Sequence, residues 1–173
     1  MNHTINDLVS RRSCRAYSER AVEEEKLLEI LKAGSYAPTG RNKQSPVIVA
    51  VEDGATRDLL SKMNAEIMGS ATDPFYGAPT VLIVLADPSV PTYLYDGALV
   101  MGNLLNAANA LGVDSCWIHR AKEEFESEEG KALLAKWGLP TDLEGIGHCI
   151  LVYRQADLPA PAPRKEGYVV RVK

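Results

Sequence analysis

The chain has 173 residues, a formal net charge of −4 and a hydrophobic content of 46%, which suits one soluble globular domain. An acidic chain is poorly suited to general binding of nucleic acid or membrane surfaces, so neither partner is expected. No signal peptide is visible, and no apolar run approaches the ~20 residues of a membrane span. The cysteines, Cys14, Cys116 and Cys149, are odd in number and far apart, which favours reduced thiols in the cytoplasm over a disulfide framework or a zinc site.

The N-terminal half alternates apolar periodic segments with a polar loop. Apolar residues at positions 5, 8 and 9 predict a short helix with Thr4 as its N-cap. Further along, the patterns predict a helix over 22–35, a loop over 37–46, a strand over 47–51 and a helix over 55–68.

The C-terminal half opens with TVLIVLA, residues 80–86. Such an uninterrupted apolar run is typical of a strand covered on both faces. The longest helical pattern covers 93–111, with Gly112 just past its end as a C-cap residue. There follow a predicted strand over 115–119, a helix over 127–137, a strand over 147–154, a proline-rich arm over 155–167 and a strand over 168–172.

These elements predict one α/β layered domain around a single sheet of four or five strands, because no internal repeat or linker is present. The unusual part is the C-terminal arm, which carries four prolines within 155–167 and leads to YVVRV. An arm of this kind is extended and poorly packed alone. Its terminal strand could pair with the far edge of its own sheet or with the sheet of a partner.

The segment RRSCR carries Arg11, Arg12 and Arg15 within five positions, with Ser13 between them. Arginine forks match phosphate oxygens, and a serine hydroxyl adds a donor. The segment is therefore a competent phosphate site. A solvated, charged helix end is an equally good interpretation of the same residues.

The second polar motif is APTGRNKQSP, residues 37–46. Its Gly40 permits a positive φ or a close backbone approach. Asn42 and Gln44 each offer a donor and an acceptor that could bind the edge of a heteroaromatic ring. A plain polar surface loop remains the alternative.

Several motifs in order resemble the nitroreductase family, in its small FMN-dependent class. They are RRSCRAY, APTGRNKQSP, FYGAPTVLIV, DGALVMGNLLNAANALGVDSCWI and the basic pair Arg164–Lys165. The resemblance covers essentially the whole chain. It implies a nitroreductase-like α+β fold over 1–173, with a central, mostly antiparallel or mixed sheet flanked by helices. It also implies that the segment 155–173 is an arm whose terminal strand is exchanged with a dimer partner.

The resemblance further implies a homodimer in which both chains build each FMN site. It implies ping-pong transfer from NAD(P)H through FMN to a small electron-poor acceptor, such as a nitroaromatic or a quinone. The flavin performs this chemistry, so no catalytic side chain and no metal is expected. The cofactor-binding positions carried over by the resemblance are Arg11, Arg12, Ser13, Arg15, Pro38, Thr39, Asn42, Gln44, His119, Arg120, Arg164 and Lys165.

Within that set, Arg11, Arg12, Ser13, Arg164 and Lys165 are expected near the phosphate. Arg15 is expected near the N1 side of the ring, and the backbone of His119 and Arg120 near N5 and O4. The loop positions 38–44 are expected to be lent by the partner subunit. Larger relatives carry a further asparagine before the strand at 80–86, for which Asn64 is the nearest candidate.

Two other functions fit the same residues. The first is an FMN-binding module or sensor without turnover, and the second is a protein that binds a different phosphorylated ligand through RRSCR. Neither a G-x-G-x-x-G motif opening a helix nor a P-loop is present. The nicotinamide would then stack on the flavin itself. The physiological acceptor and the choice between NADH and NADPH stay open.

Overall fold

Strand β3 (Thr80–Ala86) lies inside the protein with all 7 of its residues buried in the computed structural model. The structure describes residues 2–15, 17–18, 20–158 and 160–173. Outside the described residues lie Ala16 of the RRSCRAY motif, Pro159 of the arm, Met1 and Glu19. The prediction of a strand covered on both faces is confirmed over its full length.

The strands form one 5-stranded sheet in which every named pair is antiparallel. Strand β2 (Pro46–Val51) pairs with β3, and β3 pairs on its other side with the long strand β5 (Glu144–Arg154). Strands β4 (Asp114–Ile118) and β1 (Tyr17–Ser18) also pair with β5. The expectation of a mostly antiparallel sheet of four or five strands is confirmed.

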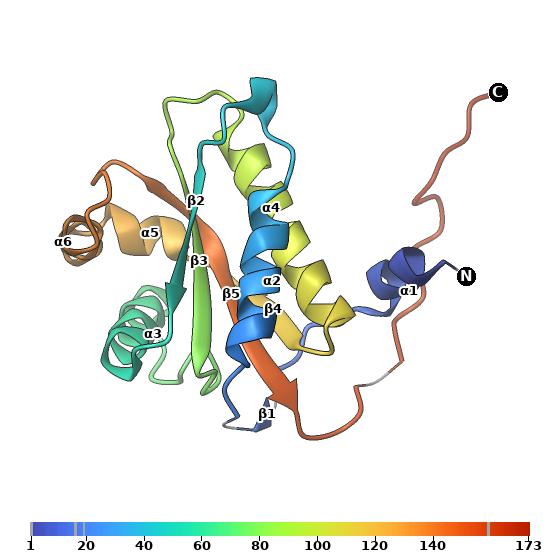
Figure 1. The fold of residues 1–173 in the computed structure, drawn as a ribbon, viewed down its shortest axis with the longest axis horizontal. Coiled ribbons are helices and arrows are strands. Elements are labelled where there is room, and N and C mark those ends of the chain that lie inside the picture. The colour runs from blue at the N-terminus through green and yellow to red at the C-terminus, as the bar shows by residue number, and fades with distance from the viewer. Residues whose placement is uncertain (1, 16, 19, 159) are drawn as a thin grey trace.

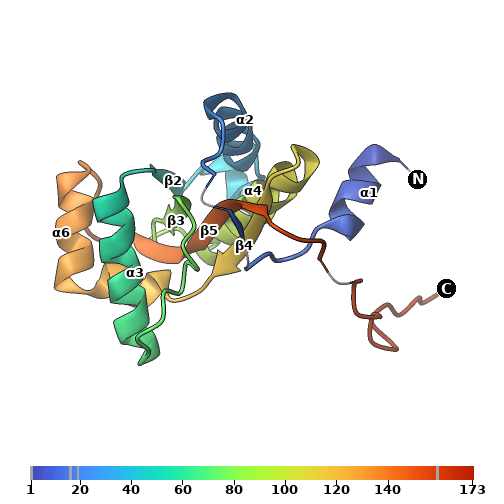
Figure 2. The same ribbon diagram turned by 90° about the horizontal axis from the view of Figure 1, so that it is seen from below.

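Helices cover both faces of this sheet (Figures 1 and 2). The helices are α1 (His3–Ser10), α2 (Glu24–Ser35), α3 (Gly54–Met68), α4 (Tyr93–Ala110), α5 (Ala121–Glu126) and α6 (Glu128–Lys136), with the short 3-10 helix η1 (Gly40–Asn42). Successive side chains of a strand point to opposite faces. Accordingly, Leu82 and Val84 pack with α2 and α4, while Ile83 and Leu85 pack with α3, α5 and α6. The sheet is the middle of three layers.

The structure corrects three local predictions. The N-cap of α1 is Asn2, whose side chain accepts a hydrogen bond from Thr4 N, so Thr4 lies within the helix. Helix α5 was not predicted, because it has only 6 residues and its apolar spacing is too short to recognise. The residues 168–172, predicted as a strand that pairs with its own sheet or with a partner's sheet, form no strand in the described chain; pairing within the chain is thus corrected, and pairing with a partner stays a prediction.

The C-terminal arm leaves β5 and runs away from the layers on the same side as α1 (Figures 1 and 2). Its apolar residues Tyr168, Val169, Val170 and Val172 are 68% to 94% exposed. Helix α1 likewise buries none of its residues. Among the described residues, no helix is long and apolar enough to cross a membrane.

Candidate functional site

The arginine-rich segment after α1 lies alongside β4. Ser13 forms an isolated parallel bridge with Ser115, and Cys14 N donates to the Ser115 carbonyl at 3.1 Å. Because the two segments run in the same direction, Arg15 lies near Trp117 further along β4, and both residues line one pocket. Arg11 and Arg15 are four residues apart, so extended chain between them spans at most about 14 Å.

This pocket, hereafter the β4 pocket, has a volume of ≈ 410 Å³. It brings together three residues that the sequence singled out, namely Arg15, His119 and Arg120. Its other lining residues are Met68, Thr72, Asp73, Pro74, Tyr76, Trp117 and Ile118. The pocket therefore combines cationic groups with flat apolar surfaces, which suits a planar anionic ligand.

Arg11 and Arg12 contain donors that the fold does not satisfy. Arg12 Nη1 donates to the carbonyls of Val9 at 2.8 Å and Arg11 at 2.6 Å. By contrast, Arg11 Nη1 and Arg12 Nε are buried without a hydrogen-bond partner among the described residues. A buried unpaired donor on a charged group is costly, and a phosphate supplies the acceptors that would relieve that cost. These residues fit the phosphate of FMN.

One wall of the β4 pocket is a turn built around Asp73. Its carboxylate accepts hydrogen bonds from Ser61 Oγ at 2.5 Å, Phe75 N at 2.8 Å and Gly77 N at 2.6 Å, and pairs with Arg57. Burial raises the pKa of Asp73, but the bonds from Ser61, Arg57 and the two backbone groups outweigh it, so the pKa lies below its ordinary value. The carboxylate is thereby held ionised.

The same turn presents Tyr76 at the pocket. Tyr76 has φ +55° and is 47% exposed. A residue with a Cβ rarely adopts this conformation, and strained residues often occur at functional sites. Of the FYGAP aromatics, Phe75 is fully buried against His148. Of these two aromatic residues, Tyr76 is the one that lines the β4 pocket.

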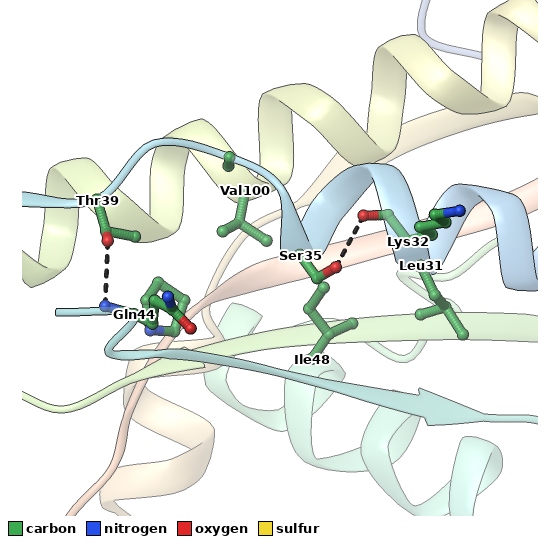
Figure 3. Close-up of a pocket in the computed structure, with 9 residues that line it drawn as sticks. Leu31, Lys32, Ser35, Thr39, Gln44, Ile48 and Val100 are labelled. Carbon is green, nitrogen blue, oxygen red and sulfur yellow. Dashed lines mark hydrogen bonds between the residues drawn. The ribbon is translucent and has the colours of Figure 1, made fainter. Parts of the chain in front are cut away.

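The loop 37–46 lies elsewhere in the single chain. Thr39 and Gln44 line a second cavity of ≈ 470 Å³, between α2, β2 and α4, where Gln44 N donates to Thr39 Oγ1 at 3.0 Å (Figure 3). Neither Pro38 nor Asn42 lines the β4 pocket. One chain therefore does not bring this loop to Arg15.

The loop conformation was only partly predicted. Gly40 is needed for close approach, because a Cβ there would lie 2.3 Å from Thr92 Oγ1. Its N–H donates to buried Asp96 of α4 at 2.9 Å. The positive φ values fall instead on Arg41, Asn42 and Gln44. Three strained residues in one loop indicate a constrained, presented surface.

Arg164 and Lys165 lie on the exposed arm, and neither makes a hydrogen bond with Arg11 in the described chain. The Arg164 guanidinium donates to Ala162 O at 2.7 Å, and Lys165 lies over the Tyr168 ring at 5.8 Å. The single chain does not bring this basic pair to the arginine-rich segment.

The described residues give no support to metal-dependent or thiolate chemistry. In the described ranges, no group of three or more His, Cys, Asp or Glu side chains could hold a metal ion. The cysteines Cys14, Cys116 and Cys149 are all buried. Burial raises the pKa of the Cys149 thiol, with nearby Cys116 adding to the effect, so this group is unsuited to thiolate chemistry.

Comparison with known proteins places this fold and site in context. A model described as "Nitroreductase family" matches residues 8–79. A protein of Archaeoglobus fulgidus, provisionally named NADH dehydrogenase/NAD(P)H nitroreductase, is 31% identical over 173 residues, covering 97% of this chain and 91% of that protein. The chain belongs to the nitroreductase family.

A second related protein and a solved structure support this family assignment. The Bacillus subtilis protein named FMN reductase (NAD(P)H) is 25% identical over 187 residues, covering 95% of this chain and 70% of that protein. The crystal structure of a Bacteroides fragilis nitroreductase with bound FMN superposes with a TM-score of 0.91 at 27% identity, covering 100% of both chains. The three-layer arrangement is thus a nitroreductase fold.

Of the groups behind the β4 pocket, the sequence analysis named Asn64 as a candidate for the further asparagine of larger relatives, but it missed Glu124. Asn64 and Glu124 are fully buried polar residues that contact the His119–Arg120 backbone or each other. Asn64 interrupts the middle of a helix, where asparagine is a poor helix former. That local conflict is a second signal for Asn64, beside the resemblance to larger relatives.

Proposed function

We propose that this protein is an FMN-dependent oxidoreductase that uses NAD(P)H. The observation that carries the proposal is the pair of buried, unpartnered guanidinium nitrogens on Arg11 and Arg12, a few residues before Arg15 enters the β4 pocket. Family membership adds independent support. The whole chain, 1–173, is one FMN-binding domain with 155–173 as its arm.

Arg11, Arg12 and Ser13 would hold the phosphate, because they provide guanidinium and hydroxyl donors on one short segment. Arg15 and the His119–Arg120 backbone would hold the ring, because they meet in the β4 pocket. Bound FMN supplies the hydride chemistry. Arg15 then contributes a positive charge that favours the electron-rich form of the ring.

The nicotinamide and the acceptor would use the β4 pocket in turn, which is ping-pong turnover. The sequence contains no separate dinucleotide motif, and Tyr76 and Trp117 offer flat surfaces beside the cations. An electron-poor acceptor, such as a nitroaromatic or a quinone, is the class that such a pocket suits.

A homodimer would complete each site. The loop residues Pro38, Thr39, Asn42 and Gln44 do not line the β4 pocket of their own chain, which is consistent with their serving a partner's pocket. The arm and α1 expose apolar residues that a second copy would cover. Pairing of 168–172 with a partner's sheet would satisfy its backbone and would carry Arg164 and Lys165 toward a phosphate. The odd number and wide spacing of the cysteines favour the reducing cytoplasm as the location.

An FMN titration followed by a reduction test examines this function. Purified protein is loaded with FMN, passed through a desalting column and examined by absorbance. We expect about one retained flavin per chain and bleaching when NADH or NADPH is added without oxygen. Protein that retains no flavin would refute FMN binding. Protein that retains flavin but stays yellow with both nucleotides would be a binding module instead.

A further inference from the structure

A buried polar network lies directly behind the β4 pocket. It consists of Asn64 from α3, Glu124 from α5 and His148 from β5, each 0% exposed. Buried polar groups are costly unless they are paired. Three of them in contact beneath one pocket therefore call for an explanation beyond packing.

Asn64 is the centre of this network. Its Nδ2 donates to the His119 carbonyl at 2.8 Å and also to Glu124 Oε1. Its Oδ1 accepts from Arg120 Nε at 2.9 Å. The other carboxylate oxygen of Glu124 lies 3.0 Å from His148 Nε2. Both hydrogens of the Asn64 amide and its oxygen are thus engaged, and Glu124 fixes the amide in one orientation.

The contact with the His119 carbonyl sets the direction of a backbone donor. A trans peptide unit is planar, so its carbonyl and its N–H point in opposite directions. Holding His119 O toward Asn64 therefore turns Arg120 N–H away from α3. Among the described residues, no acceptor is recorded for that N–H. Both His119 and Arg120 line the β4 pocket.

The backbone at this point also needs external support. Arg120 has φ +78° and is the N-cap residue of α5. A residue with a Cβ pays for this left-handed conformation, and it persists where surrounding contacts enforce it. Asn64 holds both sides of this residue, since it binds the preceding carbonyl and the Arg120 side chain.

We propose that Asn64 is a positioning residue that fixes the His119–Arg120 peptide, so that Arg120 N–H is presented to the ligand in the β4 pocket. The inference rests on the proposed FMN function. The positive end of a fixed N–H dipole favours the more electron-rich state of a bound ring. Asn64 therefore tunes the reduction potential without touching the cofactor. Glu124 keeps the Asn64 amide in place through its hydrogen bond to Nδ2.

The competing explanation is that Asn64 only connects α3 to the segment between β4 and α5. A tie between α3 and the β4–α5 connection needs one hydrogen bond, whereas Asn64 makes three and holds a strained residue at the pocket. Asn103 of α4 is an example of such a tie, because its Nδ2 donates only to Ala33 O of α2, at 2.9 Å. It provides a matched control.

The test compares Asn64→Leu, which removes the polar atoms with little change in size, with Asn103→Leu. Each FMN-loaded protein is titrated by spectroelectrochemistry, and its affinity for oxidised FMN is measured separately. We expect Asn64→Leu to weaken the binding of reduced FMN at least tenfold more than the binding of oxidised FMN. A tenfold difference lowers a two-electron reduction potential by about 30 mV. Asn103→Leu should keep the wild-type potential.

A wild-type potential in Asn64→Leu would overturn the inference, as would an equal shift in Asn103→Leu. If Asn64→Leu does not fold, Asn64→Ala decides, because it removes the same polar atoms without adding bulk or charge. Failure of both variants to fold would show a structural role and would also overturn the inference. Wild-type protein that binds no FMN would refute the proposed function itself, whereas an unshifted potential in a loaded variant refutes only the role of Asn64.

Discussion

Replacing Arg11 by alanine should weaken FMN binding without weakening the fold. Arg11 Nη1 is buried and has no hydrogen-bond partner among the described residues, so the free protein gains no bond from it. A hydrogen bond to a charged group contributes roughly 1.5–3 kcal/mol. Losing one such bond to the phosphate would raise the dissociation constant about 10- to 150-fold.

FMN should therefore raise the melting temperature of Arg11→Ala less than that of the wild type. With FMN at 100 times its dissociation constant, ligand binding stabilises the wild type by about 2.7 kcal/mol. If Arg11→Ala raises that constant 100-fold, the same FMN concentration stabilises the variant by only about 0.4 kcal/mol. Without FMN, the variant should melt at or above the wild-type temperature. Arg12→Ala should differ, because Arg12 also holds the carbonyls at the end of α1.

Fluorescence titration of the apo-proteins with FMN provides the affinity, and thermal melts with and without FMN provide the stability. Arg20→Ala is the matched control, since it removes the same charge from a guanidinium already paired with Glu23 and stacked on Tyr153. The reasoning is refuted if Arg11→Ala binds FMN as tightly as Arg20→Ala does. It is also refuted if Arg11→Ala destabilises the FMN-free protein.

Three more predictions concern the ring, the arm and a pocket wall. Arg15→Ala should lower the FMN midpoint potential more than it weakens binding, measured by spectroelectrochemistry; a wild-type potential with weakened binding would move Arg15 to the phosphate. Deleting residues 160–173 should abolish both the dimer and FMN binding in sedimentation experiments, and a truncated dimer that keeps its flavin would contradict the exchanged arm. Asp73 has a lowered pKa in the folded protein, so its contribution to stability is present above about pH 4 and is lost as the pH falls through the folded value. Asp73→Asn should therefore lose less melting temperature than the wild type between pH 5 and pH 3, and parallel curves would show that Asp73 does not carry this dependence.

The parts of the fold that follow from local chemistry were predictable. The uniformly apolar run at 80–86 could be satisfied only by cover on both faces, and β3 has that cover over the whole run. The helix predicted over 93–111 is α4, and Gly112 follows it with φ +70°. Apolar period and glycine position determined both elements without tertiary information.

The remainder depended on contacts that a single sequence does not reveal. The valine-rich end at 168–172 has strand propensity, but a strand requires a neighbouring strand, and the described chain provides none for it. Helix α5 was missed because Ser127 separates it from α6 after only 6 residues. The strand prediction depended on a distant partner, whereas α5 was missed because its local pattern is too short to recognise.

The candidate site was likewise predictable only in part. The resemblance to a family placed Arg15, His119 and Arg120 at one ring, and the structure brings these three into one pocket. The network behind them joins Asn64 to Glu124 across 60 positions and Glu124 to His148. Such contacts have no local pattern, so the sequence pointed to Asn64 alone, through the resemblance and its place in mid-helix, and gave no sign of Glu124 or His148.

The most direct test of the central claim separates the two halves of turnover. FMN-loaded protein is reduced anaerobically with one equivalent of NADH or NADPH, the nicotinamide is removed by gel filtration, and a quinone or nitroaromatic is then added. We expect bleaching in the first step and return of the yellow colour in the second, after the nicotinamide has gone. Flavin that stays oxidised with both nucleotides, or that is reoxidised by the acceptor only while nicotinamide remains, would contradict a ping-pong FMN oxidoreductase.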